Sequence, residues 1–520
     1  MRSLLPLAAL LLALPLPARQ EPVPAPPFAE SIDVEVVNVE VQVTDREGRR
    51  VPGLDRGDFE LFVDGRPVEI VNFAEVAEGS TVAPKEPLPS APQESLPAPP
   101  GEAAPAAPSE PEPLSLVIYV DNDNLRPFRR NRALQQLGEV LDGMLGPRDR
   151  TMLVTREGSL HVRRPLSPGK ESLAADLKKL ERLATRGVQQ DSYPRQTFET
   201  IHEFACDREA EAHEAARSYA RIVTDEVKQT LNSLENLIES LAGIEGRKAV
   251  LYVSDGIPLR PGEDAFALLG ALCGNSDPFQ AEDVAARLRK VTTLANANGV
   301  TLHTLEAAGL RNFSGASAES QYTLLSPEMD FFNTAAVQDS LFNLASETGG
   351  RAILNANDFK PDLGKVAGDL RSYYSLGYSP ARSGDGRIHR IEVKVRREGL
   401  RVRHRTTHRD RPRDERLAAR VQTALLHGIV DNPLQARLAL VSSVPAERGR
   451  HLVTLRLQIP LKRLVLLSQD GFWTGQVSLW LGVRDAKGRI APVQNVRVPI
   501  RVPAAGGEAQ LDRPFVYDMR

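Results

Sequence analysis

Apolar and polar residues alternate between Ile32 and Val43, as they do in strands that bury one face of a sheet. The turn-forming stretches "DREGR" and "VDGR" follow, and each is flanked by further short apolar segments. This pattern predicts a small β domain over residues 31–78.

The pattern changes at Leu114, where the apolar run "LSLVIYV" predicts a strand that is buried on both faces. The segment after it places Leu134, Leu137 and Leu141 on one helical face. Later apolar runs, such as "RKAVLYVS" and "VTLHTLEA", alternate with further helical segments, including a long helical stretch over about residues 195–241. This alternation predicts a doubly wound, mostly parallel α/β sheet over residues 114–408, closed by a C-terminal hairpin.

The last part of the chain returns to strand patterns. A helix is predicted near residues 418–426, and the strands "HLVTLRLQI", "TGQVSLWLGV" and "NVRVPIRV" follow it. We therefore expect a C-terminal, β-sandwich-like domain over residues 415–520. Its final stretch, "QLDRPFVYDMR", starts a strand without a successor, which leaves two explanations open: a partner completes the domain, or the chain is shortened.

Two segments have a composition that does not predict a folded domain. Residues 1–20 combine a basic start, a short apolar run and small residues, which is typical of a secretory signal peptide. Residues 79–113 are rich in proline, alanine and glutamate, which predicts an extended linker. Elsewhere no stretch is long and apolar enough to span a membrane. We expect an exported protein, located in the periplasm, the cell envelope or the extracellular space.

Composition narrows the possible functions. The 520 residues carry a net charge of −3, so nothing in the overall charge favours nucleic acid as a partner. The sequence contains no Gly-x-Ser-x-Gly elbow, phosphate-binding loop or His-Glu-x-x-His motif, and we predict no catalytic residue. The two cysteines, Cys206 and Cys273, either form a disulfide or remain two unpaired thiols, and the sequence does not decide between them.

Several motifs together resemble the bacterial von Willebrand factor type A-related domain family. They are "VIYVDNDNLRP", "AVLYVSDGIPLRPGED", "FNLASETGGRAI" and "YYSLGYSP" with the hairpin sequence after it, and the opening β segment is also similar. The resemblance covers residues 31–408 and implies a fold with ligand loops at the carboxyl ends of the strands. In typical members, an Asp-x-Ser-x-Ser motif, a threonine and a later aspartate hold a divalent ion, and a partner carboxylate completes the ion's shell.

This sequence keeps only part of that ligand set. The resemblance matches Asp121 to the first aspartate and Asp255 to the later one, while Asp123 and Leu125 stand where the two serines are expected. The predicted metal ligands are therefore Asp121, Asp123 and Asp255, with Mg²⁺ or Ca²⁺ as the ion. Leu125 offers no oxygen, and a third carboxylate makes the site more negative, so binding of an acidic partner group is weakened.

Other features of the same loop leave alternatives open. Thr185 and Thr197 are both candidates for the threonine ligand. Without an ion, the carboxylates would repel one another, and nearby arginines at positions 126, 129 and 130 could neutralise them instead. In that case Asn124 or Asp123 would cap the next helix and nothing would be bound.

These observations favour an exported, non-enzymatic binding protein that contacts an unknown protein partner through the von Willebrand A-like domain. A secreted, metal-assisted hydrolase that uses the same carboxylates is one alternative. A structural component of the cell envelope is another.

Overall fold

The computed structural model describes residues 36–82, 113–168, 171–185, 187–204, 206–274, 284–310, 327–380, 384–485, 488–505 and 511–520. The predicted signal peptide (1–20) lies outside these residues, as does the predicted linker between residues 83 and 112. Within the described ranges, no helix has both the length and the apolar character needed to cross a bilayer.

A six-stranded sheet forms the centre of the α/β domain, in the order β11-β10-β9-β6-β7-β8. The strands are β6 (Leu114–Val120), β7 (Arg150–Glu157), β8 (Ser159–Pro168), β9 (Arg247–Ser254), β10 (Val300–Glu306) and β11 (Ala352–Ile353). All pairs are parallel except β7 with β8. Every residue of β6 is buried, as its predominantly apolar sequence predicts.

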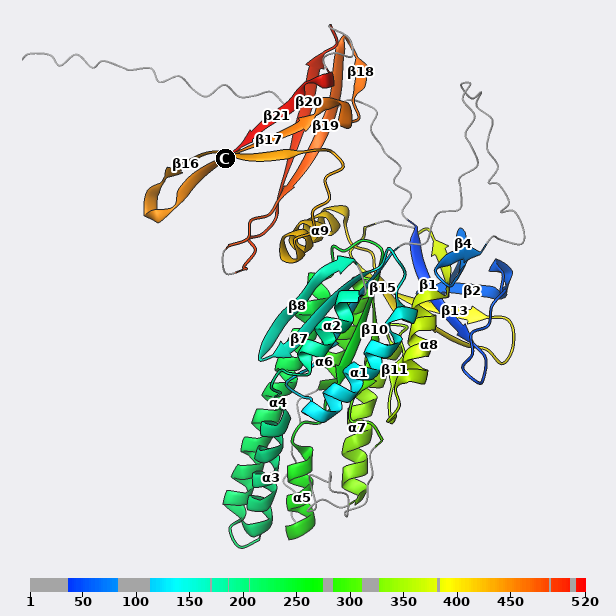
Figure 1. Cartoon of the computed structure of the whole chain (residues 1–520), viewed down its shortest axis with the longest axis vertical. Helices are drawn as coiled ribbons and strands as arrows, with labels where there is room; N and C mark the ends of the chain where they lie inside the picture. Colours follow the sequence, from blue (N-terminus) through cyan, green and yellow to red (C-terminus); the bar gives the residue numbers. More distant parts are fainter. Residues whose placement is uncertain are drawn as a thin grey trace, which may run out of the picture. The chain divides into compact units, whose positions relative to one another are not determined.

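Helices cover both faces of this sheet (Figure 1). One apolar core joins it to α1 (Pro127–Met144), α2 (Glu171–Leu180) and α8 (Lys360–Arg371). A second core on the other face joins it to α4 (Glu209–Ser240), α6 (Val284–Ala297) and α7 (Pro327–Ser346). The domain is therefore doubly wound, as predicted, and the strand order reverses between β6 and β9.

The segment predicted as a separate N-terminal β domain (31–78) shares two sheets with the strands that follow the α/β sheet. The N-terminal strands are β1 (Val37–Thr44), β2 (Phe59–Val63), β3 (Arg66–Val68), β4 (Asn72–Ala77) and β5 (Ser80–Val82), with a short helix η1 (Arg56–Asp58). The later strands are β12 (Tyr373–Tyr378), β13 (Ile388–Val395), β14 (Arg401–His404) and β15 (Thr407–Arg409). The sheet orders are β14-β1-β12-β4-β5 and β15-β13-β2-β3.

One apolar core fills the space between these two sheets, so the nine strands form one β-sandwich. Val39 and Val41 of β1 pack in the same cluster as Leu376 of β12 and Ile391 of β13. The boundaries predicted at residues 78 and 408 are thus corrected: β5 extends to Val82, and the predicted C-terminal hairpin belongs to the sandwich. Local patterns cannot show pairing between strands that are more than three hundred residues apart.

The α/β domain is therefore inserted between β5 and β12 of the sandwich. The sandwich contacts the amino ends of the parallel strands: Glu40 of β1 accepts a hydrogen bond from Arg247, the first residue of β9, at 2.8 Å. A second contact between the two domains is made by Gly79, next to β5, whose backbone N–H donates to the carbonyl of Arg371, the last residue of α8, at 2.8 Å. The carboxyl ends of the strands lie at the opposite edge of the sheet.

The C-terminal region consists of one helix and two antiparallel sheets, in the orders β16-β17-β21 and β18-β19-β20. The elements are α9 (Arg413–His427), β16 (Arg437–Pro445), η2 (Glu447–Gly449), β17 (His451–Pro460), η3 (Leu461–Arg463), β18 (Leu467–Gln469), β19 (Phe472–Leu481), β20 (Gln494–Pro503) and β21 (Pro514–Met519). The three quoted strand sequences correspond to β17, β19 and β20. The last predicted strand, β21, pairs with β17.

Candidate functional site

The structure places the predicted aspartates at the carboxyl edge of the central sheet. Asp121 and Asp123 follow β6, and Asp255 follows β9, the neighbouring strand. The backbone N–H of Asp121 donates to the carbonyl of Val253 at 2.9 Å, which fixes the start of the first loop against the second strand. This edge is the reversal point of the strand order, where open α/β sheets bind ligands.

Asp121 is fully buried and accepts four side-chain hydrogen bonds. Its Oδ1 accepts from Nη1 of Arg156 at 3.0 Å. Its Oδ2 accepts from Nδ2 of Asn124 at 2.7 Å, from the hydroxyl of Tyr252 at 2.8 Å and from the hydroxyl of Ser254 at 3.2 Å. Burying a carboxylate is costly unless hydrogen-bond donors replace water, and residues of β7, β9 and the loop after β6 supply four such donors here.

Arg156 of β7 lies between Asp121 and Asp123. Its Nη1 atom is 3.0 Å from Oδ1 of Asp121 and 3.5 Å from Oδ2 of Asp123, and its side chain is 2% exposed. Burial alone would lower the pKa of Arg156, but the two carboxylates outweigh this effect and raise the pKa above its ordinary value. The backbone N–H of Gly158 also donates to Oδ2 of Asp123 at 2.6 Å.

Two stacked tyrosines pack next to this cluster of charged side chains. The rings of Tyr119 and Tyr252, from adjacent strands, lie 5.3 Å apart at an angle of 29°. Burial, followed by the negative charge of Asp121, raises the pKa of both hydroxyls well above the ordinary value. They therefore stay protonated, and Tyr252 acts as a permanent donor to Asp121.

Asp255 has a different cationic partner. Nη1 of Arg129, from α1, lies 2.8 Å from Oδ2 of Asp255, and each of the two side chains is 15% exposed. The following residue, Gly256, has φ of +95°, and a Cβ there would lie 2.4 Å from Cγ1 of Val337 in α7. Only glycine fits this turn, which holds Asp255 at the rim.

The other residues singled out from the sequence have structural roles. Leu125 is fully buried in the core beneath α1. Arg130 donates to Oδ1 of Asn122 at 2.6 Å and to the carbonyls of Leu183 and Glu181 at 3.0 and 2.9 Å, so it anchors the loop after α2 instead of neutralising an aspartate.

The predicted cap of the next helix is not formed. The N-cap of α1 is Arg126, and its side chain makes no capping hydrogen bond, which contradicts a capping role for Asn124 or Asp123. Of the two threonine candidates, Thr185 follows Ala184, whose carbonyl accepts from Nδ2 of Asn122 at 2.8 Å. Thr197 lies on α3 (Gly187–Phe204).

The three carboxylates do not form a ligand set for Mg²⁺ or Ca²⁺ in this arrangement. Asp121 and Asp123 both point at the Arg156 guanidinium, Asp255 is paired with Arg129, and Leu125 points into the core. Such ions require about six oxygen ligands. In the described part of the chain, no group of three or more His, Cys, Asp or Glu side chains is arranged to share a metal.

A cavity of about 170 Å³ opens beside Asp255 at this edge. Its polar lining comes from Asn124, Glu226, Thr230 and Asp255. Its apolar lining comes from Val223, Val227, Ile257 and Pro258. The cavity lies along α4, at the level where this helix passes the end of the sheet.

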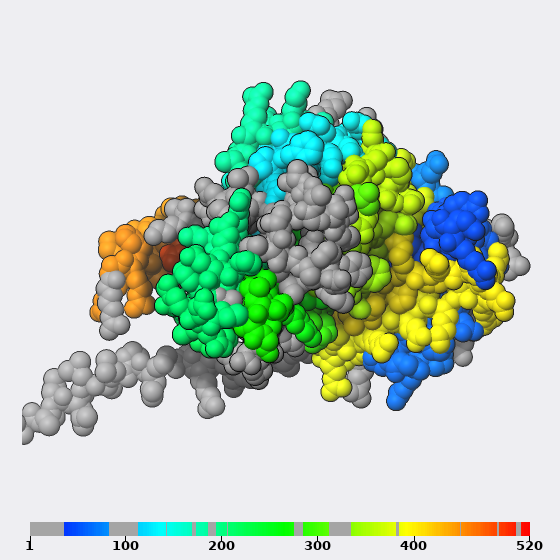
Figure 2. Space-filling view, turned by 90° about the horizontal axis from the view of Figure 1, so that it is seen from below, coloured from blue at the N-terminus to red at the C-terminus, as the bar shows by residue number. Residues whose placement is uncertain are grey.

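Beyond the sheet, the N-terminal half of α4 packs against α3 and α5 (Glu263–Cys273). We call these three helical segments the helical projection. They share a small core of their own, in which Phe198 of α3 packs with Tyr219 of α4 and Phe266 of α5. Figure 2 views the molecule from this end and shows the blue-green α3–α4 region beside the green α5 region. The sequence predicted one continuous helix over residues 195–241, whereas the chain turns between α3 and α4.

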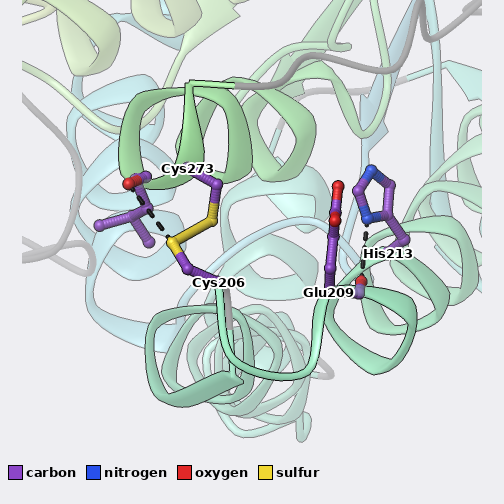
Figure 3. Close-up of a disulfide and its surroundings, with 5 residues drawn as sticks. Cys206, Glu209, His213 and Cys273 are labelled. Atoms are coloured by element: carbon purple, nitrogen blue, oxygen red, sulfur yellow. Dashed lines mark hydrogen bonds between the residues drawn. A yellow bond between two sulfur atoms is a disulfide. The ribbon is translucent and has the colours of Figure 1, made fainter.

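A disulfide fastens this projection. Cys206, in the turn between α3 and α4, is bonded to Cys273 at the end of α5, which resolves the alternatives that the sequence left open (Figure 3). His213, one turn along α4, uses Nδ1 to contact the Glu209 carbonyl at 2.9 Å. On α5, the partly buried Asp264 accepts from the Tyr219 hydroxyl at 3.0 Å, and burial raises the pKa of this carboxyl to about 6.

No protein-family model and no curated protein matches the chain. Among solved structures, an aerotolerance-related membrane protein from Bacteroides fragilis is 12% identical, with a TM-score of 0.23, and the match covers 49% of this chain and 98% of that one. Proximal thread matrix protein 1 from the mussel byssus, solved with a zinc-occupied MIDAS motif, is 12% identical with a TM-score of 0.23, covering 50% and 48%.

A third match is the pilus adhesin SpaC from Lactobacillus rhamnosus GG, which is 10% identical with a TM-score of 0.27 and covers 79% of this chain and 54% of that one. TM-scores and identities this low do not indicate a function. The strand order and the two helical layers show a doubly wound α/β domain, which is compatible with the von Willebrand A-like fold that the sequence resemblance implies.

Proposed function

We propose that this chain is an exported, non-enzymatic protein that binds another protein through the carboxyl edge of its α/β domain. The observation that carries the proposal is the composition of this edge. A buried cluster of ion pairs at the reversal point of the sheet lies next to a cavity along α4, and the N-terminal half of α4 belongs to the disulfide-fastened helical projection. Rigid elements around a partly apolar recess are features of recognition surfaces.

The state of the carboxylates favours binding over turnover. A general base must reach the proton that it removes, with a pKa suited to the task. Asp121 and Asp123 are buried, and both form ion pairs with Arg156. The more accessible Asp255 forms an ion pair with Arg129. Each carboxylate is thus engaged by a cation, so the hydrolase alternative gains no support from this geometry.

Two observations support export. The predicted signal peptide begins the sequence. In addition, Cys206 and Cys273 form a disulfide, and such bonds persist in oxidising compartments outside the cytoplasm. The location that we propose is the periplasm, the cell envelope or the extracellular space.

The experiment is a co-purification from the native envelope fraction with the full mature chain. Wild type is compared with Asp255→Ala and Arg129→Ala, which change the rim of the carboxyl edge. The matched control is Arg396→Ala, which removes an exposed ion pair with Glu60 on the β-sandwich. We expect a partner that both rim variants lose and the control retains. A partner that all four proteins retain equally would place the binding surface elsewhere, and no partner under cross-linking would favour a purely structural role.

A further inference from the structure

We infer that the Arg156 guanidinium takes the place of a divalent ion between Asp121 and Asp123, so that this edge is assembled without metal. The part of this inference that concerns a partner protein rests on the function proposed above. It adds that recognition of that partner does not depend on divalent ions. The first observation is positional. One nitrogen, Nη1 of Arg156, lies within 3.5 Å of both carboxylates, at the point where they converge.

The second observation is that the arginine is built into the sheet. Val120 of β6 pairs with Thr155 of β7, so the next residues, Asp121 directly after β6 and Arg156 within β7, lie side by side. The Arg156 side chain is enclosed, and both carboxylates are buried around it. Moving the guanidinium out would leave two buried negative charges uncompensated, which is strongly unfavourable. Arg156 is therefore not a side chain that an arriving ion displaces easily.

The third observation concerns the remaining oxygen ligands. Leu125 belongs to the apolar core beneath α1 and supplies no oxygen. Oδ2 of Asp255 is paired with Nη1 of Arg129 at 2.8 Å, while its Oδ1 is buried without a hydrogen-bond partner in the described part of the chain. The hydroxyl of Ser254 and the amide of Asn124 already donate to Asp121. The roles of Leu125, Ser254, Asn124 and Oδ2 of Asp255 thus fit a fixed monovalent cation better than a divalent ion with six ligands.

The substitution changes what a partner can bind. A divalent ion with an open position accepts a carboxylate from another protein, whereas a guanidinium has only N–H donors in a fixed plane. The guanidinium of Arg156 is enclosed, so a partner cannot reach it. The groups available at the rim are the Arg129–Asp255 pair and the cavity beside it. Contacts there require no ion, and we expect binding to be insensitive to a chelator.

The primary test starts from the wild-type protein. Wild-type protein is stripped with EDTA and titrated with Mg²⁺, Ca²⁺ and Mn²⁺ by calorimetry, by Mn²⁺ electron paramagnetic resonance and by thermal unfolding. We expect no saturable binding at millimolar concentrations and no shift in melting temperature. Saturable binding that Asp121→Asn abolishes would overturn the inference.

A second test asks whether the guanidinium is what prevents ion binding. In Arg156→Ala, the two carboxylates lose their counter-charge, so we expect a lower melting temperature that millimolar Mn²⁺ or Ca²⁺ partly restores. Arg156→Lys, which keeps the charge, should show no such restoration. The matched control, Arg163→Ala, removes an exposed ion pair with Glu157 on the neighbouring strand and should also be ion-insensitive. Ion-dependent stabilisation of the control equal to that of Arg156→Ala would contradict the inference.

The inference and the proposed function fail separately. A partner that is lost in EDTA while the rim variants also lose it would support the proposed function and overturn the metal-free edge. A wild-type protein that is insensitive to divalent ions but captures no partner would support the metal-free edge and contradict the proposed function.

Discussion

Asp369 of α8 accepts a hydrogen bond from Arg403 of β14 at 2.7 Å, which ties the inserted α/β domain to the β-sandwich. The same carboxylate accepts from Nε of Arg351 at 3.0 Å, and Gln42 of β1 donates to the Asp369 carbonyl at 2.8 Å. Burial would raise the pKa of Asp369, but Arg403 and Arg351 reverse the effect and lower it. One carboxylate thus joins two arginines from two domains.

We expect Asp369→Asn to lower the free energy of unfolding by about 3 kcal/mol, because it leaves both arginines without a counter-charge at a mostly buried position. Urea unfolding at neutral pH measures the change. The control on the same helix is Asp362→Asn, which removes an exposed pair with Lys365 and should cost less than about 1 kcal/mol. Equal losses for the two variants would show that the joint contributes no more than a surface ion pair.

The neighbouring His303 predicts a loss of stability in mild acid. Burial lowers the pKa of His303 to about 4 from its ordinary 6.5. The negative charge of Asp369 opposes this effect, and the positive charges of the nearby arginines reinforce it. Its Nδ1 accepts a hydrogen bond from the Arg351 backbone N–H at 3.2 Å, which requires the neutral ring. At a pH between these two pKa values, the histidine is protonated in the unfolded chain but not in the folded chain. The free energy of unfolding therefore falls as the pH drops from about 6.5 to about 4.

The measurement is the unfolding midpoint across this pH range for wild type and for His303→Gln. The contribution of the histidine is on the order of 3 kcal/mol. We expect the variant to lose that part of the slope while it keeps an acceptor near Arg351. A variant whose pH profile is parallel to that of wild type would rule out His303 as the source.

Asp264 predicts the opposite dependence in the helical projection. Burial raises its pKa to about 6 from 3.8, so the folded chain retains a proton that the unfolded chain has lost. Stability should therefore fall as the pH rises from about 4 to about 6. Asp264→Asn keeps an acceptor for Tyr219 and should raise the melting temperature at pH 7 but not at pH 4. Hydrogen exchange of α3 and α5 reports the effect locally, and an equal gain at both pH values would exclude titration as its cause.

The disulfide between Cys206 and Cys273 predicts a redox-dependent projection. It closes a loop over a sequence separation of 67 residues, for which loop-closure entropy gives about 4 kcal/mol of stabilisation. Reduction with dithiothreitol should increase hydrogen exchange in α3, in α5 and in the N-terminal half of α4, while the central sheet stays protected. The Cys206→Ser, Cys273→Ser double variant should match the reduced wild type and ignore the reductant. Unchanged exchange in α5 after complete reduction would contradict the prediction.

Local sequence was sufficient for the central sheet and for the loop that carries Asp121. A seven-residue run with six apolar residues, followed by four acidic and amide residues, predicts a buried strand with a polar end, and β6 has this form. The role of Arg156 could not be predicted in the same way. "RTMLVTR" indicates a strand, but only the register of β6 with β7 places Arg156 beside Asp121, and parallel register is not encoded locally.

The sandwich could not be predicted for a similar reason. The alternating valines of β1 indicate one buried face, yet they do not say which segment covers it. The covering strands, β12 and β13, begin at Tyr373 and Ile388, after the whole α/β domain. The break between α3 and α4 was also hidden, because both segments have helical sequences.

The insertion also sets an order of assembly for the newly made chain. Val37 of β1 pairs with Tyr378, and Val43 pairs with Val402, so β1 emerges hundreds of residues before either of its neighbours. The α/β domain contains its own core and can close first, whereas the sandwich must wait for the chain to return past residue 404. During that interval the valine face and both backbone edges of β1 are uncovered. A chain interrupted inside the α/β domain would leave this aggregation-prone strand permanently exposed, where chaperones or proteases recognise it.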